Sequence, residues 1–277
     1  MFISAPPVQN TYMVPLHRTI APVALNGLDI GIPLNIFSNI YTDLHYGYSI
    51  TTPSSIILQF LLGFYAYGTD RVKDTIEYQS LNNTMIYQEN KIKLYEEISE
   101  NIKLYDYTLS ASLAAIMYIL YIDNFDITRV PFLLLLGIAG NYKELKPYLN
   151  MYKPLFIATM WTITTVILPC VIYDKDYSIL SMPQDYLPCL LFIFSASNFA
   201  DSNDIEEDRL LGIDTIPVTY GVEISNTISF VAVAAASIML IESRNFENRF
   251  IINTIIEMQH IGLMWALYNN TFLTQFV

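Results

Sequence analysis

The sequence predicts an all-α membrane protein, a multi-pass bundle of about eight transmembrane helices. Hydrophobic residues make up 53% of the 277 residues and charged residues only 14%, whereas a soluble domain carries about a quarter charged residues. The mean hydropathy is +0.37, and long apolar segments recur along the chain. These segments are too long for the strands of a membrane barrel, so they favour membrane-spanning helices.

Eight apolar segments are the predicted spans. They cover residues 19–41, 53–67, 107–122, 130–141, 155–173, 186–200, 224–241 and 250–268. The fourth is short for a membrane span and is expected to borrow flanking residues or to be partly re-entrant. Because the spans use most of the chain, we expect a single membrane domain covering residues 1–277.

The charge and the metal-binding residues exclude several classes of function. A formal net charge of −12 argues against a nucleic-acid partner, because phosphate binding needs a basic surface. Three histidines and two cysteines, Cys170 and Cys189, are too few and too scattered for a zinc site, and both thiols are expected to be buried. The first 18 residues lack a basic segment followed by an apolar core, so no cleavable signal or transit peptide is predicted.

The longest polar stretch, residues 75–106, lies between the second and third spans. Within it the sequence IYQENKIKLYEEISENIKLY places Ile, Leu and Tyr at helical spacing. This pattern predicts an amphipathic helix that lies on the bilayer surface or caps a cavity. A solvated connector is the alternative.

Five carboxylates follow the sixth span within eight residues: Asp201, Asp204, Glu206, Glu207 and Asp208. They cannot all stay ionised so close together unless a cation or solvent offsets their repulsion. If the segment is helical, Asp201, Asp204 and Asp208 share one face. Such oxygen ligands suit Mg²⁺, which also bridges to substrate phosphates. A solvated acidic loop is the alternative.

A second acidic cluster follows the second span. Asp70 and Asp74 are four residues apart and therefore share one face of a helix. Facing the first cluster, they could hold two or more Mg²⁺ ions with a diphosphate between them. Candidate diphosphate contacts are Lys143, Lys146 and Lys153, with Arg71 and Arg209 as weaker ones and Lys73 as a further basic neighbour.

Positive charges predict how the chain is oriented. With eight spans and the N-terminus inside, most of the 14 Lys and Arg residues fall on one side of the membrane. Both aspartate clusters and the lysine loop fall on that same positive-rich face, which would be cytoplasmic, stromal or matrix. We therefore expect them to form a single site there.

The second cluster and its tail, DxxDxxxDRxxGxxTxPV, resemble the second aspartate motif of the UbiA superfamily of intramembrane prenyltransferases. The matching residues are Asp201, Asp204, Asp208, Gly212, Thr215 and Pro217. GTDRVKD is similar to the end of the first motif, NxxxDxxxD, with Asp70 and Asp74 as the matching aspartates. The order of spans, basic loop and motifs extends the resemblance over nearly the whole chain.

The resemblance implies a Mg²⁺-dependent prenyltransferase. It would move an isoprenoid chain from a prenyl diphosphate to a lipophilic acceptor, which is an aromatic compound, a quinone precursor or a chlorin. The magnesium ligands implied are Asp70, Asp74, Asp201, Asp204 and Asp208, with the basic residues named above on the diphosphate. The same fold also supports a terpene cyclase, which needs no acceptor.

Three departures separate this sequence from the family pattern. Ala66 stands where the first motif has asparagine, and Tyr67 replaces a frequent acidic neighbour, which leaves the first metal site poorer in ligands. The family commonly has nine spans, whereas eight are predicted here. No Arg-Thr or Arg-Pro follows Asp74, a feature of many members with aromatic acceptors. Ala66 also favours a further alternative, a degenerate, non-catalytic membrane protein that binds lipid or acts as a scaffold.

Overall fold

The computed structural model describes residues 32–42, 52–81, 89–122, 134, 137–138, 140–173, 177–242 and 258–267. All regular secondary structure in these residues is helical, which confirms the all-α prediction for this part of the chain. The predicted first, fourth and eighth spans lie partly outside the described residues.

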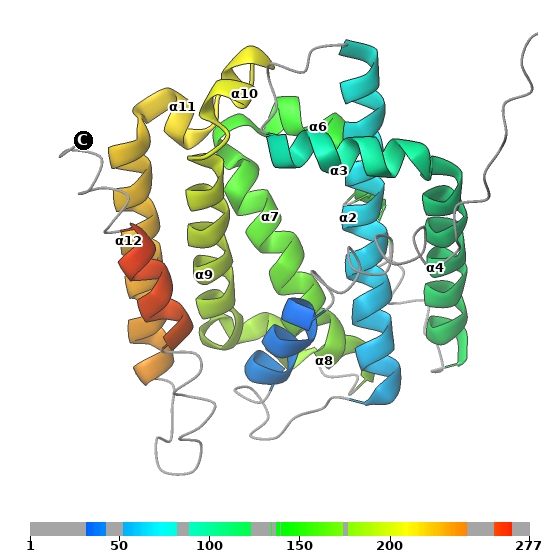
Figure 1. Cartoon of the computed structure of the whole chain (residues 1–277). Coiled ribbons are helices and arrows are strands. Elements are labelled where there is room, and N and C mark those ends of the chain that lie inside the picture. The colour runs from blue at the N-terminus through cyan, green and yellow to red at the C-terminus, as the bar shows by residue number, and fades with distance from the viewer. Residues whose placement is uncertain are drawn as a thin grey trace, which may run out of the picture.

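Long helices form the body of the molecule (Figure 1). They are α2 (Pro53–Leu81), α4 (Ile102–Ile122), α7 (Lys153–Thr162) with its continuation η3 (Ile163–Ile167) and α8 (Leu168–Tyr173), α9 (Pro183–Asp201) and α12 (Val222–Glu242). The short helices α3 (Glu89–Glu100), α6 (Tyr142–Leu149), α10 (Ile205–Leu210) and α11 (Ile216–Tyr220) gather at one end of this bundle, the upper end in Figure 1. The single turns η2 (Asn150–Tyr152) and η4 (Ser178–Ser181) precede α7 and α9.

Two helical stretches in the described residues are long and apolar enough to cross a membrane, Tyr142–Val171 and Val222–Ile241. They overlap the predicted fifth and seventh spans, residues 155–173 and 224–241, and the first of them also includes the lysine loop. The other predicted spans do not meet the same requirement in the described part of the chain, so the eight-span count is not confirmed.

The main core is formed by the helix that runs from α7 through η3 to α8, by α9 and α12, and by the helical residues 32–42 and 258–267. Small side chains such as Ala236 let α12 approach α9 closely. Asn198 of α9 ties the two helices together, because its amide donates to the Ser225 carbonyl at 3.0 Å and to the Ser229 hydroxyl at 2.8 Å. Cys170 and Cys189 are both buried thiols, as predicted.

Helix α3 forms within the polar stretch, as the amphipathic pattern predicts. Its apolar side packs on α2 and α4, where Ile98 is fully buried in a cluster with Phe64 and Tyr105. Tyr95 of α3 also lies against Tyr78 of α2, with 5.6 Å between the ring centroids. The start of the polar stretch, residues 75–81, belongs instead to the end of α2. Helix α3 is therefore held over the bundle by its buried face.

The junction between α7 and α8 is a π-helical turn, η3 (Ile163–Ile167). The amide of Leu168 donates to the carbonyl of Ile163, five residues earlier. Pro169 follows directly and has no N–H for an α-helical bond to Thr165. The wider turn accommodates this missing donor and places Ile163 and Thr164 in the wall of a cavity described below.

Candidate functional site

A cavity of about 600 Å³ is lined by residues of the long helices and of the short helices at the upper end of the bundle. Eight of the ten predicted site residues line it: Asp70, Arg71, Asp74, Lys143, Lys146, Lys153, Asp201 and Asp204. They come from α2, α6, the start of α7, the end of α9 and the turn before α10. The structure thus brings together both aspartate clusters and the lysine loop.

The other two predicted residues, Asp208 and Arg209, do not line this cavity. Asp208 is fully buried behind the wall and contacts the cavity through two lysines that do line it, Lys146 and Lys153. Arg209 follows Asp208 on the same helix, and consecutive helical residues point about 100° apart. Arg209 is therefore exposed while Asp208 is buried. No diphosphate contact for Arg209 is supported by this arrangement.

The second aspartate cluster is not one continuous helix, so the condition under which its three aspartates would share one helical face is not met. Helix α9 ends at Asp201, a turn covers Ser202 and Asn203, and Asp204 occupies the N-cap position of α10. Asp201 and Asp208 still converge, but Asp204 turns toward another helix. Helix α10 then ends before Gly212, whose φ of 68° is a left-handed conformation that glycine adopts without strain.

Lys153 neutralises the buried part of this cluster. Its side chain is 7% exposed, and its Nζ lies 2.7 Å from Oδ1 of Asp201 and 3.4 Å from Oδ2 of Asp208. Lys146 adds a second contact to Asp208 at 3.0 Å. Burial raises the pKa of Asp201, and the charge of Lys153 opposes this rise. Buried carboxylates need such counter-charges, because an unpaired charge away from water is costly.

Lys91 of α3 was not predicted as a site residue, yet it closes one side of the cavity. Its Nζ lies 3.0 Å from Asp204 and 2.7 Å from Glu207 of α10. Partial burial disfavours its charge, but the hydrogen bonds to Glu207 and Asp204 outweigh that effect and raise the pKa of Lys91. The signal in the sequence was the amphipathic pattern itself, since a helix that caps a cavity directs some polar residues into it.

Lys143 of α6 pairs with the first aspartate cluster. It contacts Asp74 and lies 2.6 Å from Glu77, another cavity residue that was not predicted. Glu77 follows Asp74 by three residues on α2, so helical spacing was the available signal. Asp70 has no ion-pair partner within 4 Å among the described residues. Burial and the neighbouring charge of Asp74 raise its pKa to about 6, while Lys143 opposes the rise.

Lys73 has a different role from the other lysines, because it does not line the cavity. Its Nζ donates to the carbonyl of Gly140 at 2.9 Å and to Glu144 at 2.8 Å. Lys73 therefore ties α2 to the start of α6, the helix that carries Lys143 and Lys146.

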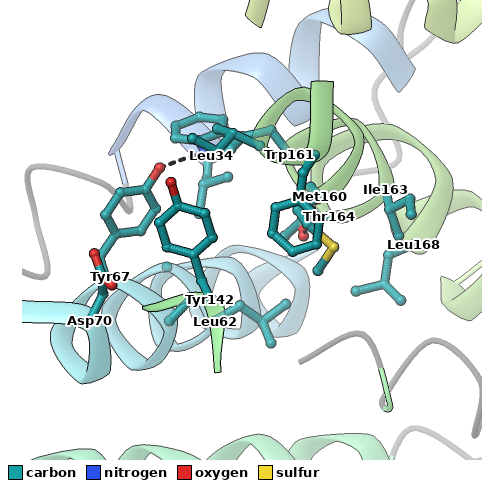
Figure 2. A pocket seen from close by; sticks show the side chains of 14 residues that line it. Leu34, Leu62, Tyr67, Asp70, Tyr142, Met160, Trp161, Ile163, Thr164 and Leu168 are labelled. Atoms are coloured by element: carbon teal, nitrogen blue, oxygen red, sulfur yellow. Dashed lines mark hydrogen bonds between the residues drawn. The ribbon is translucent and has the colours of Figure 1, made fainter. Parts of the chain in front are cut away.

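A smaller, largely apolar cavity of about 120 Å³ lies beside the charged one. The two share Tyr67, Asp70, Tyr142, Ile157 and Trp161 as lining residues. Figure 2 shows aromatic side chains beside Asp70 and aliphatic ones such as Leu62 and Leu168 farther along the pocket. Ala66, at the position of the family asparagine, lies in this apolar wall. The arrangement suits a molecule with an anionic head and an apolar tail.

The carboxylates have the chemistry of a Mg²⁺ site, because Mg²⁺ prefers oxygen ligands. Oδ2 of Asp201 is buried and has no hydrogen-bond partner in the described part of the chain. Within the same residues, no three His, Cys, Asp or Glu side chains already form a metal-binding group. The oxygen ligands of this cluster therefore fit Mg²⁺. In this structure the counter-charge comes from lysine side chains, which are paired with the carboxylates.

Comparisons with known proteins add no assignment. The chain matches no protein-family model, no curated protein and no solved structure. The resemblance to UbiA prenyltransferases therefore depends on the two aspartate motifs and on their order among the helices.

Proposed function

We propose that this chain is a multi-pass membrane prenyltransferase of UbiA type, which uses Mg²⁺ to transfer an isoprenoid chain from a prenyl diphosphate to a lipophilic acceptor. The observation that carries the proposal is the direct contact between a charged cavity and an apolar cavity, which share five lining residues. A prenyl diphosphate has the same division into an anionic head and an apolar chain.

The charged cavity is suited to the diphosphate. Lys143, Lys146 and Lys153 line it from α6 and α7, with Arg71 on α2, and these cations would bind the phosphate oxygens. Asp70, Asp74, Asp201 and Asp204 line this cavity and would hold Mg²⁺, which stabilises the negative charge on a departing diphosphate. Asp208, buried behind the wall, would act through its contacts with Lys146 and Lys153. A lysine that releases its carboxylate can bind phosphate instead. The same lysines would therefore pair with carboxylates in the empty cavity and with the diphosphate when the donor is bound.

The proposed reaction is a substitution at the first carbon of the prenyl chain, C1. The bond between C1 and the bridging oxygen breaks, and its electron pair stays on that oxygen, which leaves diphosphate and an allylic cation. A nucleophilic carbon or oxygen of the acceptor then bonds to C1 and loses one proton, which the diphosphate takes up. Tyr67, Tyr142 and Trp161 at the junction offer aromatic faces that stabilise such a cation.

The outer surfaces of α4 and α12 support a membrane location. Large apolar side chains are exposed on both helices, among them Met117 and Tyr121 on α4 and Val231 and Ile238 on α12. Extended apolar surfaces of this kind are unfavourable in water and are typical of lipid-facing helices. Lipophilic donors and acceptors would reach the apolar cavity from the bilayer.

Diphosphate release from a panel of prenyl diphosphates, by the purified protein in detergent, tests the proposal. We expect release to need both Mg²⁺ and one lipophilic acceptor. Asp204→Ala should lower the rate by about 100-fold or more, as loss of a group that stabilises developing charge does. Glu206→Ala is the matched control, because Glu206 belongs to the same cluster but is exposed and lies outside the cavity lining.

Other outcomes would replace the proposal. Release with Mg²⁺ alone would identify a cyclase or a hydrolase. Full activity of Asp204→Ala would contradict the assigned site. No release from any donor would favour the non-catalytic, lipid-binding alternative.

A further inference from the structure

Tyr67 occupies the boundary between the charged and the apolar cavity. It lines both of them and lies three residues before Asp70 on α2. Figure 2 shows its side chain beside Tyr142, with a hydrogen bond from the indole N–H of Trp161 to the Tyr67 hydroxyl oxygen. A molecule that fills both cavities would contact this residue.

The hydrogen bond to Trp161 fixes how the Tyr67 hydroxyl can be used. Nε1 of Trp161 lies 2.7 Å from the phenol oxygen, and an indole N–H can only donate. The phenol oxygen therefore accepts this bond, and its own hydrogen stays available. Trp161 is the hydroxyl's single hydrogen-bond partner among the described residues. Tyr67 can thus donate one hydrogen bond to a ligand.

Packing holds this pair in place. The rings of Tyr67 and Trp161 meet edge to face, with centroids 6.3 Å apart and planes at 81°. Phe37 packs on Trp161 in the same manner, at 6.1 Å and 88°. Such a preorganised donor acts without reorganisation at the moment of reaction.

The position of the junction indicates which ligand atom would lie there. If the diphosphate occupies the charged cavity and the prenyl chain the apolar one, the atom that joins them is the oxygen between C1 and phosphorus. This oxygen receives the electron pair when the bond to C1 breaks. A hydrogen bond to it strengthens as its charge grows, so the bond favours the transition state over the bound substrate.

We propose that Tyr67, oriented by Trp161, donates a hydrogen bond to the bridging oxygen of the prenyl diphosphate and stabilises it as the leaving group. The inference rests on the proposed function. The proton stays on Tyr67 throughout, so the overall balance of the reaction is unchanged. Tyr67 is then a catalytic residue at a variable position of the first aspartate motif.

The test compares two donors in wild type and in Tyr67→Phe. The substitution keeps the ring and its contact with Trp161 but removes the hydroxyl. With the oxygen-bridged donor, kcat should fall about 10- to 100-fold while KM changes little, since the lost interaction belongs to the transition state. With a donor that carries sulfur in place of the bridging oxygen, a weak acceptor, the two proteins should differ by less than about threefold.

Two further variants separate this role from a structural one. Trp161→Phe removes the N–H that orients the hydroxyl, so we expect a smaller loss of kcat that also disappears with the sulfur donor. Tyr65→Phe is the control, because Tyr65 lies on the same helix but lines neither cavity, and it should retain wild-type kcat.

Two results would overturn the inference alone. One is wild-type kcat in Tyr67→Phe with the oxygen donor, and the other is an equal loss with both donors, which would indicate a structural role. Absence of diphosphate release by the wild-type protein from any donor would overturn the proposed function, and the inference with it.

Discussion

Lys153 is a buried cation shared by two buried carboxylates, and its removal is expected to destabilise the fold. Lys153→Met keeps the length and apolar character of the side chain but removes its charge. Asp201 would then lose its ion-pair partner, and Asp208 would keep only Lys146. Breaking a buried ion pair by removing one partner costs about 3–5 kcal/mol. That is a large part of the total stability of about 5–15 kcal/mol typical of folded proteins.

The assay is equilibrium unfolding in mixed detergent micelles, followed by helical circular dichroism. The control is the double variant Lys153→Met/Asp201→Asn, in which both members of the closest pair are neutral. We expect it to recover most of the loss, because replacing both partners of a buried pair is often close to neutral. Wild-type stability of Lys153→Met, or a double variant no more stable than the single one, would refute the reasoning.

The pH dependence of the loss provides a second readout. Burial already raises the pKa of Asp201, and Lys153 opposes that rise, so its removal should raise the pKa further. A carboxyl whose pKa is higher in the folded than in the unfolded state lowers the free energy of unfolding at any pH above its folded-state pKa. At a pH below its unfolded-state pKa it is protonated in both states and has no such effect. The loss in Lys153→Met should therefore be complete at about pH 8 and shrink toward about pH 4, near the pKa of an unfolded aspartate.

Two further variants test the surroundings of the site. Lys73→Met removes the tie between α2 and α6, so the KM for the prenyl diphosphate should rise about tenfold, while stability falls by less than about 1 kcal/mol because this pair is partly exposed. An unchanged KM would show that α6 is positioned without it. Ala66→Asn adds an amide oxygen one turn before Asp70 and should lower the Mg²⁺ concentration for half-maximal diphosphate release about tenfold, in line with oxygen ligation. An unchanged Mg²⁺ requirement would place residue 66 outside the metal site.

The helices were largely predictable from apolar segments, but their ends were not. The second predicted span stops at residue 67, where the apolar residues end, whereas α2 continues to Leu81. Val72 and Thr75 are buried in that continuation, so packing against neighbouring helices extends it beyond the apolar segment. Hydropathy measures preference for lipid and carries little information about packing within the protein.

The break in the second aspartate cluster did have a signal in the sequence. Asp204 is a favoured N-cap residue, and Glu207 follows at the position typical of a capping box. The spacing of the aspartates, three and then four residues, instead suggested one continuous helix. Motif spacing located the residues correctly along the chain but did not resolve where one helix ended and the next began.

The partners of the carboxylates were the least predictable part of the site. Lys91 lies 113 residues before Asp204 in the chain, and no local pattern connects them. Lys143, by contrast, was predicted at the site because the order of the spans placed its loop on the same face as the aspartates. Topology therefore predicted which segments meet, whereas the individual ion pairs depend on side-chain geometry that only the folded chain defines.

The charge balance of the cavity links these pairs to the proposed chemistry. Six carboxylates line it: Asp70, Asp74, Glu77, Asp201, Asp204 and Glu207. Five cations line it with them: Arg71, Lys91, Lys143, Lys146 and Lys153. With buried Asp208 behind the wall, full ionisation gives an excess of negative charge, so a diphosphate entering alone would be repelled. Cations brought with the diphosphate would remove this repulsion and release the lysines to bind phosphate, which is the physical reason to expect that donor binding and Mg²⁺ binding depend on each other.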